Sequence, residues 1–131
     1  MDMDVERSLV RLVDRSHRAR LRTLLESKHG RQKFIYTLSN TPWFDERFVS
    51  NVRQSDSSAL HSDCVYSDLV SRGAPEDCYV IRDNGDGSSM PLRTAIDNLC
   101  GQGQAILLVC IPGCLAYWEP ELGPGAIVAR P

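Results

Sequence analysis

Apolar residues recur at helical intervals along the first part of the chain. Between residues 5 and 27, leucine and valine return at steps of three and four, with arginine and aspartate between them. Such spacing places the apolar side chains on one face of a helix. The positions of this stripe are Leu9, Leu12, Val13, Leu21, Leu24 and Leu25. We therefore expect a long helix over residues 5–27, with Gly30 as its C-terminal cap.

Shorter amphipathic stretches predict four more helices. Each starts near a capping residue or a proline, or ends near a glycine, as helices commonly do. The expected ranges are 31–38, 43–48, 59–71 and 91–99. Residues 53–58 contain no apolar side chain, so we expect an exposed loop there.

β-branched and aromatic residues mark the expected strands. These strands cover residues 78–82, 105–111 and 115–118, and one more follows the Gly123-Pro124-Gly125 break. Pro112 and Gly113 interrupt the longest apolar run, which predicts a hairpin at that point. The acidic and glycine-rich residues 83–89 are typical of a turn.

The order of these elements predicts an α+β fold, because helices come first and a hairpin comes last. We expect one domain over residues 1–131. In it, N-terminal helices pack on one face of a small mixed sheet of three to four strands that ends in a C-terminal β-hairpin. Strands 78–82 and 105–111 are joined through a helix, so a right-handed crossover would make them parallel.

The bulk composition indicates a soluble globular protein, with 42% hydrophobic and 24% charged residues. The longest apolar run, residues 105–111, is far shorter than the roughly 20 residues that span a bilayer. The acidic start of the chain does not resemble a secretory signal. We therefore expect a cytoplasmic protein without a membrane segment.

The five cysteines are an odd number, and four of them lie in apolar segments. Free thiols that pack as small hydrophobic side chains are the simplest interpretation. Cys110 and Cys114 leave an alternative open, since a hairpin could bring them opposite each other. A disulfide across it would be strained and labile.

Charge is divided unevenly along the chain. Residues 5–33 hold nine Lys or Arg against three Asp or Glu, whereas residues 34–131 hold six against twelve. Thirteen of the fifteen basic residues are arginine. Such a division concerns the sign of a partner rather than the fold.

Arginines on the first expected helix are the best candidates for a binding surface. Arg11, Arg15, Arg18 and Arg22 recur at steps of four, three and four, which places them along one helical face. Each guanidinium is a planar fork of donors that suits carboxylates or phosphates. The alternative is a solvated face that keeps the protein soluble. Because the rest of the chain is acidic, an acidic protein partner or a second copy of the chain is favoured over nucleic acid.

Tyr117 and Trp118 on the hairpin are the second candidate surface. Successive strand residues point to opposite faces of a sheet, so both cannot enter the same core. If one face is uncovered, one aromatic side chain is exposed and could anchor a partner. If both faces are covered, neither is available.

Familiar catalytic and metal-binding motifs fail on spacing. The acidic loop at residues 83–87 lacks the ligand order of a calcium loop, and residues 101–104 leave a helix where a dinucleotide fingerprint would open one. His61 and Cys64 are two ligands where a zinc site needs at least three. Cys64 beside His61 is also the only thiol whose sequence neighbour could activate it.

We therefore expect no metal and no cofactor. The expected function is that of a non-enzymatic protein-binding or regulatory module that uses the arginine-rich first helix and the aromatic hairpin. One alternative is nucleic-acid contact by the same helix. The other is a small enzyme with a Cys64–His61 site.

Overall fold

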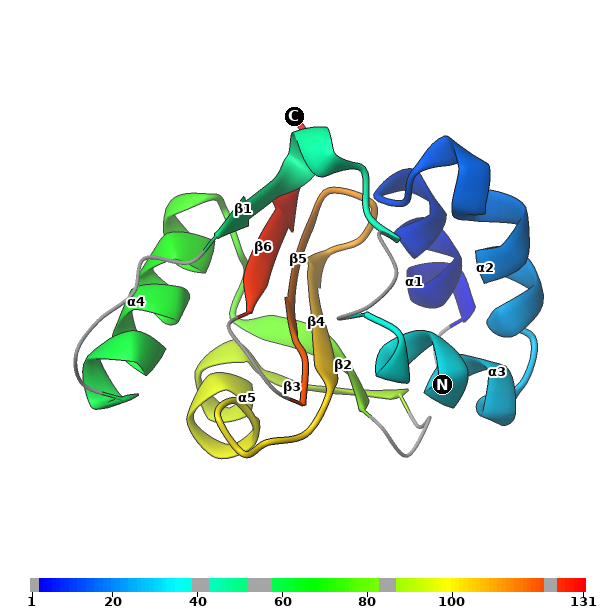
Figure 1. The fold of residues 1–131 in the computed structure, drawn as a ribbon. Helices are drawn as coiled ribbons and strands as arrows, with labels where there is room; N and C mark the ends of the chain where they lie inside the picture. The colour runs from blue at the N-terminus through cyan, green and yellow to red at the C-terminus, as the bar shows by residue number, and fades with distance from the viewer. Residues whose placement is uncertain (1–2, 39–42, 52–57, 83–86, 122–124) are drawn as a thin grey trace.

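An antiparallel β-sheet forms the middle layer of the molecule (Figure 1). The computed structural model describes residues 3–38, 43–51, 58–82, 87–121 and 125–131. The described strands are β1 Val49–Asn51, β2 Asp77–Arg82, β3 Gly87–Pro91, β4 Ile106–Ile111, β5 Leu115–Glu119 and β6 Ala126–Ala129. Their order across the sheet is β1-β6-β5-β4-β2-β3, and each neighbouring pair is antiparallel.

Helices cover both faces of this sheet (Figure 1). The α-helices are α1 Met3–Ser8, α2 Arg18–Leu24, α3 Lys28–Tyr36, α4 Ser58–Ser71 and α5 Leu92–Leu99. Among the described residues, three 3-10 turns accompany them: η1 Leu9–Arg11, η2 Arg15–His17 and η3 Glu46–Phe48. The segments α1 to α3 pack on one face, while α4 and α5 pack on the other. The fold is therefore α+β, but with three layers rather than the predicted two.

The alternation of side chains along the strands explains why both faces need a cover. On β2, Tyr79 and Ile81 belong to the core beneath α1 to α3, whereas Cys78 and Val80 belong to the core beneath α4 and α5. All four are buried. The sheet is thus apolar on both sides, and the prediction of helices on one face is wrong.

The predicted sheet of three to four strands is also too small. Residues 87–89, expected in a turn, belong to the edge strand β3, which pairs along β2. Residues 83–86 of that expected turn, like most of the expected loop at 53–58, lie outside the described residues. The two edge strands, β1 and β3, lack the apolar pattern that would predict a strand. Each is paired with its neighbour through the main chain, and this pairing leaves no pattern in the sequence.

The predicted parallel pairing of β2 with β4 is wrong, since their register is antiparallel. The reason is the unexpected strand β3. It reverses the chain, so that α5 connects β3 to β4, and these two strands run in the same direction on either side of β2. The helix α5 therefore does connect two strands of the same direction, but these strands are β3 and β4 rather than β2 and β4.

Elements with strong local patterns match their prediction. The helix expected at 59–71 is α4, which ends in a Schellman motif at Gly73 (φ 97°), and the helix expected at 91–99 is α5. The turn between β4 and β5 is also present, but this hairpin does not end the sheet as predicted, because β6 pairs with β5 and β1 pairs with β6. The amide of Cys114 donates to the carbonyl of Ile111 at 2.9 Å, and Gly113 has a φ of 75°. This is the geometry of a type II turn with proline and glycine at its centre.

The predicted long N-terminal helix is broken between η1 and η2. Val13 forms an isolated antiparallel bridge with Phe44. The amide of Asp14 donates to the carbonyl of Trp43 at 2.7 Å, and that of Asp45 donates to Leu12 at 2.9 Å. The side chain of Asp14 then accepts from the amide of Ser16 and starts the next turn. The break leaves two shorter helical arms that face each other.

Gly30 lies inside the first turn of α3 rather than at a helix C-terminus. Ser27 caps this helix, since its hydroxyl accepts from the amide of Gly30 at 2.9 Å. A Cβ atom at Gly30 would overlap the carbonyl oxygen of Leu24. Glycine therefore allows α3 to start against the end of α2, and the two arms stay close.

Candidate functional site

The break in the N-terminal segment divides the predicted row of arginines. Arg11 ends η1, Arg15 starts η2, and Arg18 and Arg22 lie on α2. The four side chains therefore do not form one continuous ladder. Arg11 and Arg22 instead line the same cleft, together with Arg7 of α1.

Arg18 makes a contact within the fold, at the break in the N-terminal segment. It is half-buried, and its Nε donates to the carbonyl oxygen of Val13 at 3.2 Å. This bond satisfies a main-chain acceptor at the break. Arg15 is exposed on the short turn before α2 and does not line the cleft.

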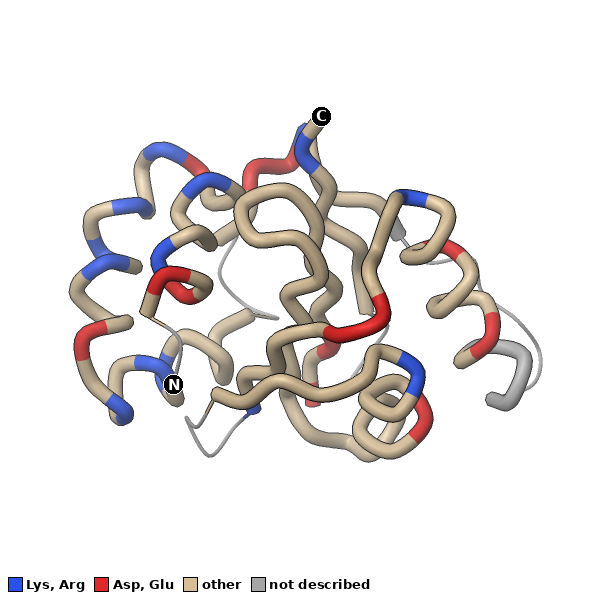
Figure 2. Tube along the Cα trace, turned by 180° about the vertical axis from the view of Figure 1, so that it is seen from behind, with Lys and Arg blue, Asp and Glu red and all other residues tan. Residues whose placement is uncertain are grey.

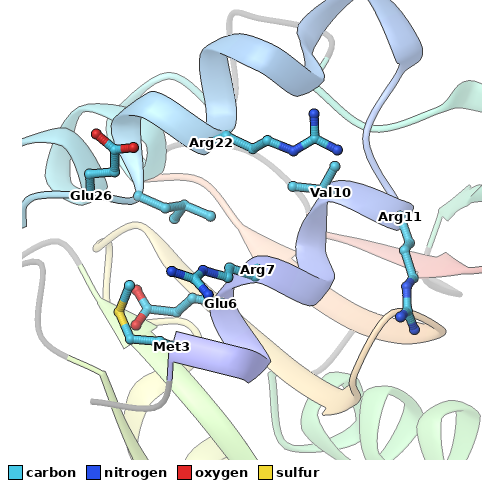
Figure 3. Close-up of a pocket in the computed structure, with 8 residues that line it drawn as sticks. Met3, Glu6, Arg7, Val10, Arg11, Arg22 and Glu26 are labelled. Atoms are coloured by element: carbon cyan, nitrogen blue, oxygen red, sulfur yellow. The ribbon is translucent and has the colours of Figure 1, made fainter.

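The cleft lies between α1–η1 and α2 and has a volume of about 490 Å³ (Figure 3). This falls in the range of about 300–1,000 Å³ that is usual for ligand sites. Its walls carry three arginines, Arg7, Arg11 and Arg22, and two acidic residues, Glu6 and Glu26. Three apolar side chains complete the lining: Met3, Val10 and Leu25.

The three cleft arginines are available to a ligand. Each is exposed, and no ion pair within the described part of the chain joins Arg7, Arg11 or Arg22 to a carboxylate. Figure 2 shows the same imbalance on a larger scale, with lysine and arginine gathered over the N-terminal helices. The cleft therefore presents three guanidinium groups that no ion pair among the described residues neutralises.

Arg11 also connects the cleft to the β4–β5 hairpin. A Cβ atom placed on Gly113 would lie 2.9 Å from the Cδ of Arg11, so this side chain lies directly against the hairpin turn. In Figure 3 it reaches from η1 toward that turn. The helical arm and the hairpin thus meet, but through Arg11 and a glycine rather than through the aromatic residues.

A buried ion pair supports the floor of the cleft. Glu6 has no exposed surface, and its Oε1 lies 3.4 Å from the Nε of Arg31, which is 4% exposed. The hydroxyl of Tyr79 donates to Oε2 of Glu6 at 3.2 Å, and Nη1 of Arg31 donates to the carbonyl of Leu25 at 3.2 Å. These contacts join α1 to α3 and β2. Sequence reasoning missed them, because nothing in the spacing sets Glu6 apart from a surface acid.

Tyr117 and Trp118 do not form the exposed aromatic surface that was one of the two expectations. Tyr117 is fully buried beneath α4 and α5, and burial raises the pKa of its hydroxyl. Trp118 is half-buried on the opposite face, where its ring stacks on Phe44 with centroids 6.5 Å apart. The sheet is covered on both sides, as the alternative interpretation required.

The cysteines are free thiols, including Cys110 and Cys114, so the alternative of a hairpin disulfide is wrong in this structure. Cys110 is buried and Cys114 is exposed. Burial raises the pKa of Cys78 and of Cys110 to about 12, and it also raises the pKa of Cys100. These three thiols are therefore neutral at physiological pH and unsuited to nucleophilic attack.

The Cys64–His61 alternative stays a prediction. Cys64 is half-buried on α4, and the side chain of His61 lies outside the described part. No cluster of three or more potential metal ligands occurs among the described residues. None of the described helices has the length and apolar character that crossing a bilayer requires.

The rate at which each cysteine of the native protein is alkylated distinguishes the buried thiols from the exposed ones. With iodoacetamide at pH 7.5 and detection by mass spectrometry, we expect Cys114 to be labelled first, because it is exposed at the hairpin turn. We expect Cys78, Cys100 and Cys110 to react only after unfolding. Labelling of Cys110 as fast as Cys114 would contradict the burial seen here. Labelling of Cys64 faster than a free model thiol would favour the enzyme alternative.

Comparison of the chain with known protein families, with curated proteins and with solved structures gives no match.

Proposed function

We propose that this protein is a non-enzymatic protein-binding module, and that the cleft between α1–η1 and α2 receives an acidic segment of a partner protein. The observation that carries this proposal is the set of three exposed guanidinium groups around one cleft, none of which forms an ion pair with another described residue. Guanidinium groups bind carboxylates through paired hydrogen bonds as well as through charge.

The charge of the rest of the chain favours a protein partner over nucleic acid. Residues 34–131 carry twice as many acidic as basic residues, and these would repel a phosphate backbone that extends beyond the cleft. The cleft itself contains Glu26 and Glu6. A short acidic segment can avoid these groups, whereas a nucleic acid with a charge on every phosphate cannot do so as easily.

Charge reversal in the cleft tests this proposal. The probe is a fluorescein-labelled peptide of nine residues, alternating Asp and Glu around a central Leu, measured by fluorescence anisotropy at low salt. We expect Arg22→Glu to weaken its binding about tenfold or more, because one attraction becomes a repulsion, and a tenfold loss corresponds to about 1.4 kcal/mol. Arg11→Glu should have a similar effect, and neither change should alter the unfolding midpoint by much, because both side chains are exposed.

Arg72→Glu is the matched control. Arg72 is exposed just after α4, on the other side of the sheet, and its reversal changes the net charge equally. Equal loss of binding in Arg72→Glu and Arg22→Glu would show that only net charge matters, which contradicts a site in the cleft. Tighter binding of a single-stranded DNA oligonucleotide than of the peptide, with a steep dependence on salt, would favour the nucleic-acid alternative.

A further inference from the structure

The cleft is not lined by charge alone. Val10 and Leu25 form part of its surface between the arginines, and Met3 lies at its edge. Met3 is 39% exposed, one of three large apolar side chains in the described part of the chain that face solvent to this extent. Val10 is 8% and Leu25 is 3% exposed, so Met3 supplies most of the apolar surface that a ligand made only of carboxylates would leave in contact with water.

Charged groups are arranged unequally around this apolar surface. In Figure 3, Met3, Glu6 and Glu26 lie toward one end of the cleft, and Arg11 lies at the other end, beyond Val10. The guanidinium of Arg22 reaches over Val10 from α2. In the same figure the guanidinium of Arg7 lies beside Glu6, at the end that also holds Glu26. A carboxylate is therefore attracted most strongly toward the end formed by Arg11 and Arg22, where none of the acidic lining residues lies.

We propose that the acidic segment carries one apolar side chain of about the size of leucine, which enters the cleft between Met3, Val10 and Leu25. Carboxylates next to this anchor then pair with Arg11 and Arg22. This inference rests on the proposed function and names the chemistry that the partner needs. A buried apolar anchor within a ring of polar contacts is the arrangement that supplies most of the affinity at protein interfaces.

The choice of an apolar anchor follows from the relative size of the two contributions. Exposed ion pairs each contribute little, because water and salt screen them. Burial of a leucine side chain contributes enough to change an affinity by tenfold or more. The arginines would therefore select a negatively charged segment and fix its orientation. The apolar anchor would distinguish one acidic segment from another.

Two peptides that differ at one position test the inference. The first is the labelled nine-residue acidic peptide with a central Leu, and the second has Ser at that place. We expect the Leu peptide to bind about tenfold more tightly than the Ser peptide at 150 mM salt. Met3→Ser should remove most of this difference, since Met3 forms one side of the apolar surface.

Val70→Ser is the matched control, because Val70 is an exposed apolar residue (45%) on α4, on the far side of the sheet. We expect it to leave the difference between the peptides unchanged. If both peptides bind equally and Arg22→Glu weakens both, the anchor is overturned while the proposed function survives. If Met3→Ser and Val70→Ser change the difference in affinity between the two peptides equally, the anchor does not enter this cleft. If neither peptide binds, the proposed function and the anchor are both overturned.

Discussion

Replacement of Glu6 by alanine is expected to lower the free energy of unfolding by about 3–5 kcal/mol, the usual cost of breaking a buried ion pair. The reason is that Arg31 is 4% exposed and would keep a buried charge without its carboxylate partner. Equilibrium unfolding in urea, followed by tryptophan fluorescence, measures this change, since Trp43 is buried in the native state.

A double-mutant cycle is the control for this prediction. Arg31→Met alone should also be costly, because it leaves the Glu6 carboxylate in the core. The double variant Glu6→Leu/Arg31→Met should cost much less than the two single changes together, since neither buried charge of this pair remains. Tyr79→Phe removes the hydrogen bond from the Tyr79 hydroxyl to Glu6 and should cost about 1 kcal/mol. Strict additivity of the two single changes would contradict the buried pair.

Alkaline pH is expected to unfold the protein through its buried thiols. Burial raises the folded-state pKa of Cys78 and Cys110 to about 12, and raises that of Cys100, from an ordinary value near 9. Below this ordinary value both states keep the thiols protonated, so stability does not depend on them. Above it the unfolded chain releases protons that the folded chain retains. The free energy of unfolding then falls as pH rises, by up to about 1.4 kcal/mol per pH unit for each thiol.

Urea unfolding at pH 8, 9 and 10 in the presence of a reductant measures this dependence. The variant Cys110→Ala removes one of the three buried thiols, so the slope between pH 9 and 10 should decrease by about a third. Tyr117, whose pKa burial also raises, adds a loss of the same sign at still higher pH. Constant stability from pH 8 to 10 would show that these thiols are hydrated in solution.

The sequence predicts correctly those elements whose structure is determined by residues close together in the chain. The stripe of Leu92, Ala95, Ile96 and Leu99 predicts one face of α5, and the first three of these residues are buried while Leu99 is half-buried. The turn at Pro112 and Gly113 predicts the β4–β5 hairpin. In each case residues within a few positions of one another define both the element and its buried side.

The predictions failed where distant segments decide the local structure. The N-terminal helix breaks because Val13 bridges to Phe44 and Asp14 bonds to Trp43, and no periodicity at either place records this. The candidate site depends on that break. The sequence predicts arginines as candidate binding residues, and Arg11 and Arg22 do line one cleft, but the shape of that cleft and the position of Arg7 in it follow only from the folded arms.

The position of β6 has a consequence for the synthesis of this chain. It is the last described strand, yet it lies inside the sheet between β5 and β1. A growing chain therefore holds β1 without a neighbour until residues 126–129 have left the ribosome. The addition of β1 to the sheet must wait for this long-range event, whereas β2, β3, β4 and β5 can pair without β6. Topologies with such long-range pairings fold slowly compared with those built from local contacts. During that interval the nascent protein exposes two unpaired strand edges, which is when protection by a chaperone would matter most.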